Sequence, residues 1–249
     1  MALSRKRKRP KRRSRNLFRG PLALDRMFDE VVRKGYDVSA PPILYHYTEW
    51  AGASGILSGQ QFWATAHHCT NDSAELASAD AVIVEVATNL RNNATGAAAE
   101  ALSWFLDGYP DLQVGKLLTV CLACFSIARD DAEQWKRYGD NGRGICLGLR
   151  VLNEPPPTAN KSAIVRVDYT ESSWRDTVTK SFQEICWLLS RAEVSTHNIN
   201  LGLNALYRIA AIASISAKRP EWAVEQEFRH ATLVPDKVRH QLKEREVAD

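Results

Sequence analysis

The feature that most constrains this chain is a strand-like stretch near its C-terminal end, residues 227–234. Phe228, Thr232 and Val234 favour an extended backbone. Pro235 follows and is expected to end the strand, because proline has no N–H to give to a neighbouring strand. The rest of the chain can be organised around this one strand.

Charged residues alternate along the start of this stretch. Because side chains of an extended segment alternate between its two faces, Glu225, Glu227 and Arg229 are expected to share one face. Repulsion and burial would raise the pKa of at least one of the two carboxyl groups, while Arg229 would lower it. Two interpretations stay open at this point. The stretch is either a solvated strand face with a ladder of charges or a site that holds a reactive carboxylate.

The order of the remaining segments predicts an α+β fold with a mixed or antiparallel split sheet, because strands and grouped helices do not alternate regularly. We expect a single α+β domain over residues 21–249. Strands are expected at about 43–47, 62–65, 117–125, 144–149 and 163–169, and helices at about 22–34, 49–57, 72–90, 97–106, 130–138, 173–192, 196–217 and 237–247. The expected N-caps are Thr48, Asn71 or Asp72, and Asp130.

Positive charge is concentrated at the start of the chain. Residues 1–20 carry ten Lys or Arg and no acid, whereas the remaining residues hold 23 Lys or Arg against 29 Asp or Glu. A segment so charged and so poor in apolar residues is expected to be a disordered basic arm. Through residues 5–19 it is expected to bind nucleic acid, or to direct nuclear import if the protein is delivered into a eukaryotic cell. A simple solubilising role stays open.

Composition narrows the class of protein. The 249 residues are 45% hydrophobic and 25% charged, as in ordinary globular domains. No apolar run approaches the roughly 20 residues that span a bilayer, so no membrane association is expected. The five cysteines are scattered and fit free thiols in the cytoplasm. The cluster of His67, His68, Cys69 and Asp72 lacks the paired spacing of a zinc site, and no metal is expected.

Several short blocks are similar to those of a bacterial family of unknown function, number 2971. They follow the order of that family over about residues 43–234. The blocks are His46-Tyr-Thr48 with Ile56-Leu57, Asn71-Asp72-x-x-Glu75, Cys124-Phe-Ser126, Trp135-x-x-Tyr138 with Gly144, and Lys218, Trp222 and Glu225-x-Glu227-x-Arg229.

Two of these segments, Leu44-Tyr-His-Tyr-Thr48 and Gly55-Ile-Leu-Ser-Gly59, also resemble the opening of ADP-ribosyltransferases of the poly-ADP-ribose polymerase type. The resemblance implies an ADP-ribosyltransferase-like sheet and NAD as a substrate. Glu227 would be the catalytic carboxylate, Glu225 would orient the acceptor, and His46 would bind the adenosine ribose.

The same resemblance implies roles for further residues. Thr48 would bind the nicotinamide amide, and Ser126 is an alternative at the neighbouring strand end. Tyr138, Trp135 or Trp63 would stack on nicotinamide. Apart from the resemblance, Arg229 and Arg143 are expected to supply fixed positive charge for the phosphates of a dinucleotide. Tyr47 departs from the family pattern, which has glycine at this position.

The leading functional hypothesis is therefore an NAD-consuming ADP-ribosyltransferase-like enzyme, such as a toxin, effector or defence protein, with an unknown macromolecular acceptor. The alternative from a second class is a metal-dependent nuclease associated with nucleic acid, which would use Asp72, Glu75, Glu225 and Glu227 together with the basic arm. A non-catalytic binding module is the third possibility.

Overall fold

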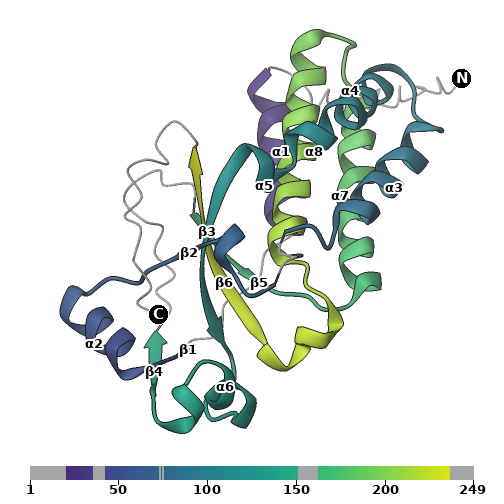
Figure 1. Cartoon of the computed structure of the whole chain (residues 1–249). Coiled ribbons are helices and arrows are strands. Elements are labelled where there is room, and N and C mark those ends of the chain that lie inside the picture. Colours follow the sequence, from purple (N-terminus) through teal and green to yellow (C-terminus); the bar gives the residue numbers. More distant parts are fainter. Residues whose placement is uncertain (1–20, 36–42, 73, 75, 151–161, 236–249) are drawn as a thin grey trace, which may run out of the picture.

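The computed structural model describes residues 21–35, 43–72, 74, 76–150 and 162–235. The expected basic arm at 1–20 and the expected helix at 237–247 lie outside these residues. Within them the chain forms one sheet and a layer of helices (Figure 1). The single domain over 21–249 stays a prediction.

The sheet has six strands, and every pairing within it is antiparallel. The strand order is β4-β1-β3-β6-β5, and β2 pairs with β3 away from this path. The α+β fold class is confirmed. The strands are β1 (Ile43–Thr48), β2 (Thr65–Ala66), β3 (Leu118–Ser126), β4 (Ile145–Arg150), β5 (Ser162–Arg166) and β6 (Glu227–Pro235).

The helices α1, α3, α4, α7 and α8 gather on one side of the sheet (Figure 1). Their apolar faces pack into a shared core that includes Phe28, Ile83, Phe105, Phe182 and Leu206. The helices are α1 (Pro21–Gly35), α2 (Trp50–Gly59), α3 (Asp80–Arg91), α4 (Gly96–Leu112), α5 (Val114–Leu117), α6 (Ala132–Arg137), α7 (Glu171–Leu189) and α8 (Thr196–Ser216), with 3₁₀ turns η1 (His67–Cys69), η2 (Asp140–Gly142) and η3 (Pro220–Glu225).

Helix α8 joins the helical layer to the sheet. Its residue Ile215 packs with Val120, Val165 and Ala231 of the strands in a second core cluster. By length and composition α8 could cross a membrane, which corrects the expectation that no apolar run approaches that length. However, 56% of its apolar window is buried inside the protein, as expected for a central core helix.

The sheet is almost divided between β1 and β3. These strands are paired only at Tyr45 and Ser126. Farther along the same edge of β3, Cys121 and Leu122 pair with β2. The residues of β3 between these two contacts therefore have no strand partner on this edge. The sheet thus has an opening next to the middle of β3.

The structure corrects several predicted elements between residues 62 and 112. The expected strand at 62–65 is reduced to Thr65 and Ala66, and the helix expected from residue 72 begins at Asp80. Helix α4 continues through Pro110 to Leu112 instead of ending before it. Tyr109 and Gln113 each donate a 2.8 Å hydrogen bond to the Asp80 carboxylate, which fastens this end of α4 to α3.

All three predicted N-caps are wrong. Helix α3 is preceded by Ala79 rather than by Asn71 or Asp72. Helix α2 is preceded by Glu49 rather than Thr48, and no side chain caps it. The N-cap of α6 is Asp131, whose carboxylate accepts hydrogen bonds from the backbone N–H groups of Glu133 and Gln134. Asp130, which was expected to cap this helix, instead accepts a hydrogen bond from a tryptophan side chain of α6.

Candidate functional site

A cavity of about 360 Å³ lies at the opening of the sheet. It is bordered by β1, by the segment from Trp63 to Asn71, by the end of β3, by α6 and by the start of β6. The polar side chains of its wall include Lys218, Glu225 and Glu227. These three residues are the buried charges around which the rest of the site is arranged.

Lys218 connects the two glutamates. Its ammonium lies 2.7 Å from Glu225 Oε2 and 3.2 Å from Glu227 Oε2. Behind Glu227, Arg229 Nε lies 2.9 Å from Oε1. All four side chains are buried, with 3%, 3%, 4% and 0% exposure for Lys218, Glu225, Glu227 and Arg229. This burial excludes the interpretation of residues 225–229 as a solvated strand face.

The backbone between the two glutamates explains how both reach one lysine. Glu225 ends η3, and β6 begins only at Glu227. Between them Gln226 has a φ of +45°, a left-handed conformation that is uncommon for residues other than glycine. The prediction that Glu225, Glu227 and Arg229 share one face of an extended segment is therefore wrong for Glu225, which lies outside the strand. The turn at Gln226, not strand alternation, brings the two carboxylates together.

The charges of the cluster determine the ionisation of Glu227. Burial raises the pKa of this carboxyl group, but Arg229 and Lys218 together outweigh burial and hold the pKa below its ordinary value. Burial lowers the pKa of Lys218, yet the two carboxylates raise it above its ordinary value. The expected rise in a carboxyl pKa is therefore not found at Glu227, which is ionised at neutral pH.

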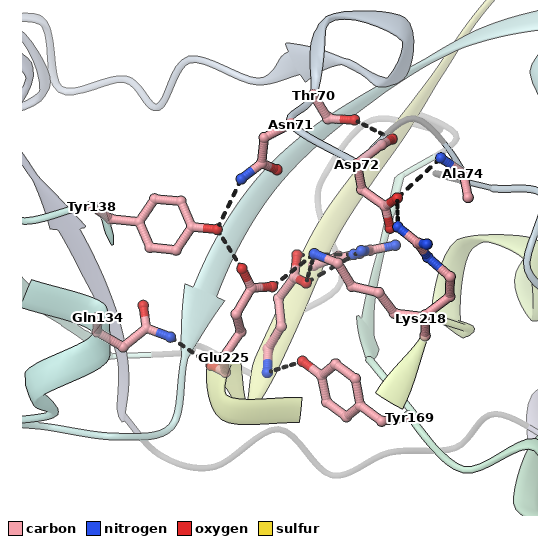
Figure 2. A network of polar contacts seen from close by, with 12 residues as sticks. Thr70, Asn71, Asp72, Ala74, Gln134, Tyr138, Tyr169, Lys218 and Glu225 are labelled. Carbon is pink, nitrogen blue, oxygen red and sulfur yellow. Dashed lines mark hydrogen bonds and ion pairs between the residues drawn. The ribbon is translucent and has the colours of Figure 1, made fainter. Parts of the chain in front are cut away.

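Helix α6 holds Glu225 from the other side. The Tyr138 hydroxyl donates a short hydrogen bond to Glu225 Oε1, and Gln134 Nε2 donates to the Glu225 backbone oxygen at 2.9 Å. Figure 2 shows Tyr138 and Lys218 approaching the Glu225 carboxylate from different directions. Asn71 Nδ2 in turn donates to the Tyr138 hydroxyl at 3.4 Å. Tyr138 and Lys218 thus fix the Glu225 carboxylate, Gln134 fixes its backbone, and Asn71 supports Tyr138.

His46 borders the same cavity from β1. Burial lowers the pKa of its imidazole, so the ring is neutral at physiological pH. Its Nδ1 lies 2.9 Å from the Cys124 carbonyl oxygen, which identifies Nδ1 as the protonated nitrogen and Nε2 as an acceptor. The ring packs against Phe62 and Phe125, with centroid distances of 5.4 and 5.8 Å.

His46 and Glu227 approach the cavity from opposite faces of the sheet. Tyr45 is opposite Ser126, and Ser126 is opposite Glu227, so these three side chains share one face. His46 follows Tyr45 and points to the other face, where it contacts Phe125. Both residues can border one cavity because the sheet is open at this point. They do not form a directly facing pair.

Two other expected ligand residues lie apart from the cavity. Thr48 does not border it, and its Oγ1 occupies space against α2, where a Cβ added to Gly52 would lie 2.2 Å from that oxygen. Trp135 packs edge-on against Tyr47 at 5.0 Å, and its indole N–H donates to Asp130 at 2.7 Å. The roles predicted for Thr48 and Trp135 therefore have no support in this geometry.

Other expected residues do border the cavity. Tyr138 and Trp63 are part of its wall, and Trp63 is 63% exposed. Ser126 also borders it, but its Oγ already accepts a hydrogen bond from the backbone N–H of Ala128 at 3.1 Å. Of the three aromatic residues suggested for stacking, Tyr138 and Trp63 thus border the cavity, and their stacking on nicotinamide stays a prediction.

Lys218 and Cys124 were included in the family blocks of the sequence analysis, but no role in the site was predicted for either of them. Lys218 lies two residues after the end of the apolar helix α8 and seven residues before Glu225, but this spacing does not determine its contacts. Cys124 borders the cavity beside Glu227 and is exposed to it. The surrounding protein keeps bulk water away from the thiol, and this desolvation together with the Glu227 carboxylate raises the pKa of the thiol well above its ordinary value. The thiol is therefore protonated and a poor nucleophile at neutral pH.

Comparison with known families bears on one part of the chain. Residues 134–230 match the family model described as "Protein of unknown function (DUF2971)". This match supports the predicted resemblance to that family over residues 134–230, and the predicted blocks before residue 134 lie outside the match. The matched range holds Tyr138, Lys218, Glu225, Glu227 and Arg229, and hence the whole buried charge cluster. No curated protein and no solved structure matches the chain. The ADP-ribosyltransferase resemblance thus depends on the short motifs alone.

Proposed function

We propose that this protein is an NAD-consuming, ADP-ribosyltransferase-like enzyme that cleaves the bond between nicotinamide and ribose. The single observation that supports the proposal is Glu227, an ionised carboxylate held by Lys218 and Arg229 at the wall of a cavity. Such a group is already oriented before a ligand enters, because its partners are themselves buried. Fixed charges of this kind are effective in catalysis since they need no rearrangement during the reaction.

The proposed chemistry depends on charge rather than on proton transfer by Glu227. As nicotinamide leaves NAD, positive charge develops on the ribose carbon and its ring oxygen. The Glu227 carboxylate stabilises this charge, and its lowered pKa keeps it ionised for that task. Nicotinamide leaves as a neutral molecule with the electron pair of the broken bond. A water molecule or another acceptor then adds to the ribose carbon, and the proton that it loses passes to the solvent.

Glu225 and His46 have secondary roles in this proposal. Glu225, fixed by Tyr138 and Lys218, orients the acceptor. His46 contributes Nε2 as an acceptor for a hydroxyl group of the ligand, because Nδ1 is committed to the Cys124 carbonyl. The geometry gives His46 no direct contact with Glu227, so the reaction is assigned to the carboxylate.

The nuclease alternative receives less support from the same geometry. Asp72 is paired with Arg219 at 2.8 Å, while Glu225 and Glu227 are paired with Lys218. A divalent cation would have to displace these positive side chains. Among the described residues, no group of three or more His, Cys, Asp or Glu side chains is arranged to hold a metal ion. Glu75 lies outside the described residues.

The test is to incubate the protein with NAD and to follow nicotinamide release by chromatography. Glu227→Gln should reduce the rate by about 100-fold or more, as removal of a transition-state-stabilising group commonly does. Glu221→Gln is the matched control, because that carboxylate is 56% exposed and pairs with Arg219 at 3.0 Å. Absence of nicotinamide release from the unmodified protein would overturn the proposal and favour a non-catalytic binding module.

A further inference from the structure

A second cavity, of about 530 Å³, is bordered by Gln226, the residue between the two glutamates. Its wall also includes Ile127, residues 166–170 at the end of β5, the first turns of α7, and Ala223. It shares no bordering residue with the cavity beside Glu227. We infer that this second cavity is a binding site for a free α-amino acid with an apolar side chain, bound in its zwitterionic form.

Two opposite charges border the second cavity without pairing with each other. Arg166 and Asp168 are two positions apart in an extended segment, so their side chains project from the same side. Among the described residues, no ion pair joins the two, and Arg166 has no other charged partner. Asp168 accepts the Thr170 N–H through Oδ1 at 2.9 Å, which leaves Oδ2 for a ligand. A molecule with a carboxylate and an ammonium group can therefore bridge Arg166 and Asp168.

The start of α7 supplies further donors for the ligand carboxylate. The helix begins at Glu171, and among the described residues no side chain caps it at Thr170. The N–H groups of an uncapped first turn have no partner within the helix, and they attract negative groups. Glu171 itself does not border the cavity and is paired with Arg175 at 2.9 Å. Its carboxylate is thus engaged away from the ligand.

A buried donor without an acceptor lies at the same end of α7. Trp174 borders the cavity and is only 7% exposed, and its indole N–H has no hydrogen-bond acceptor among the described residues. Side chains of a helix lean toward its N-terminus, so this ring lies over the uncapped first turn. Buried N–H groups are normally paired. A carboxylate oxygen of the ligand supplies the missing acceptor.

The remaining wall suits an apolar side chain rather than a second charged group. Ile127 is 38% exposed, Ala223 is also exposed, and both border the cavity. The volume of about 530 Å³ lies within the roughly 300–1,000 Å³ of small-molecule sites. A phosphate dianion fits this wall less well, because Asp168 would repel it.

The experiment compares three ligands of matched shape by calorimetry on the full chain, without NAD. They are L-leucine, 4-methylpentanoate, which lacks the ammonium group, and 3-methylbutylamine, which lacks the carboxylate. L-Leucine should bind at least about tenfold more tightly than either analogue, because each analogue loses one charge-assisted hydrogen bond. A lack of L-leucine binding would overturn the inference. So would equal binding of L-leucine and one of the analogues, since the site would then recognise a single charge.

Two variants test the location of the site. Arg166→Gln and Asp168→Asn should each weaken L-leucine binding by about tenfold. Asp168→Asn retains a side-chain oxygen that can accept the Thr170 N–H, so the start of α7 is kept. Arg26→Gln is the control, because Arg26 is an exposed arginine of α1 that does not border the cavity. Equal effects of Arg166→Gln and Arg26→Gln would contradict the assignment to this cavity.

Binding of L-leucine and cleavage of NAD are independent measurements. Binding of L-leucine without nicotinamide release would retain the second site and remove the proposed function. Nicotinamide release from a protein that does not bind L-leucine would retain the function and overturn the second site.

Discussion

The helical core and the charge cluster are equally buried but are stabilised in opposite ways. Phe105, Phe182 and Leu206 have 0% exposure and contact other apolar side chains. The cluster of Glu227 and Arg229 has 4% and 0% exposure and is held by ion pairs and hydrogen bonds. Apolar packing is non-directional, whereas every charge in the cluster depends on particular partners.

This difference predicts that the apolar core tolerates amino-acid substitution better than the charge cluster does. An apolar core accepts substitutions that keep volume, because any close-packed hydrocarbon serves. A buried ion cluster contributes little net stability relative to an apolar replacement, yet loss of one partner leaves an uncompensated charge. A cluster with this property, placed at the wall of a cavity, is more readily explained by a functional demand than by stability.

The largest effect is expected from Arg229→Met. This change removes the cation behind Glu227 while keeping most of the side-chain volume, and it should lower the free energy of unfolding by about 3–5 kcal/mol. Urea denaturation followed by circular dichroism measures the change. Arg143→Met, at an arginine whose side chain is 76% exposed, serves as the control and should shift stability by less than about 1 kcal/mol. Similar values for both variants would contradict the dependence of the buried charge cluster on its particular partners.

The next largest effect is expected in the apolar core. Leu206→Ala should cost about 2–4 kcal/mol, because the helical layer cannot fully collapse around the missing methyl groups. Leu206→Met should cost less than about 1.5 kcal/mol, since volume is nearly conserved. The same denaturation measurement applies to both. If Leu206→Met lowered the free energy of unfolding as much as Arg229→Met, the apolar core would be no more tolerant of substitution than the charge cluster, which would contradict the comparison.

The sequence predicts the elements better than it predicts their contacts. The apolar run of β3 and the helical periodicity of α7 and α8 were sufficient to locate these elements, because each pattern is local. The class of fold followed from their order. By contrast, the left-handed turn at Gln226 has no local signal, since neither glycine nor asparagine stands there.

The misassigned segment before α3 illustrates the same limit. A helix was expected from residue 72, but the Asp72 carboxylate accepts the Ala74 N–H and pairs with Arg219, far away in sequence. Asn71 similarly reaches Tyr138. Long-range partners of this kind determine the backbone where no strong periodicity exists. Glu225 and Glu227 could be selected as candidates from the sequence, but their coupling through Lys218 could not.

The third prediction concerns acid and applies to the cluster only. The folded pKa of Glu227 is below its ordinary value of 4.5, so its stabilising contribution is complete above that pH and is lost as pH falls through the folded pKa. Burial and the two cations shift the pKa of Glu227 in opposite directions and partly cancel. We therefore expect acid to lower the free energy of unfolding by less than the removal of Arg229 does. Denaturation midpoints measured between pH 7 and pH 3 should fall more steeply for the unmodified protein than for Glu227→Gln. Parallel curves would contradict the ionised state assigned to Glu227.

The smallest effect on stability is expected from Tyr138→Phe. This variant tests whether the hydroxyl group of Tyr138 stabilises the charge cluster. The ring remains, but Glu225 loses a hydrogen-bond donor and Asn71 loses its acceptor. Hydrogen bonds to charged groups contribute about 1.5–3 kcal/mol, and partial exposure of Tyr138 places the expected loss near the lower end.

Tyr207→Phe is the matched control for this change, because no hydrogen bond of its hydroxyl is found among the described residues and its ring packs 4.9 Å from Phe105 in the helical core. Its stability should change by less than about 0.5 kcal/mol. A difference of at least about 1 kcal/mol between the two variants would show that the hydroxyl of Tyr138 belongs energetically to the charge cluster. Equal changes in stability would show that Tyr138 contributes through the packing of its ring and not through its hydroxyl group. The Glu225 carboxylate would then depend on Lys218 alone for its orientation at the cavity wall.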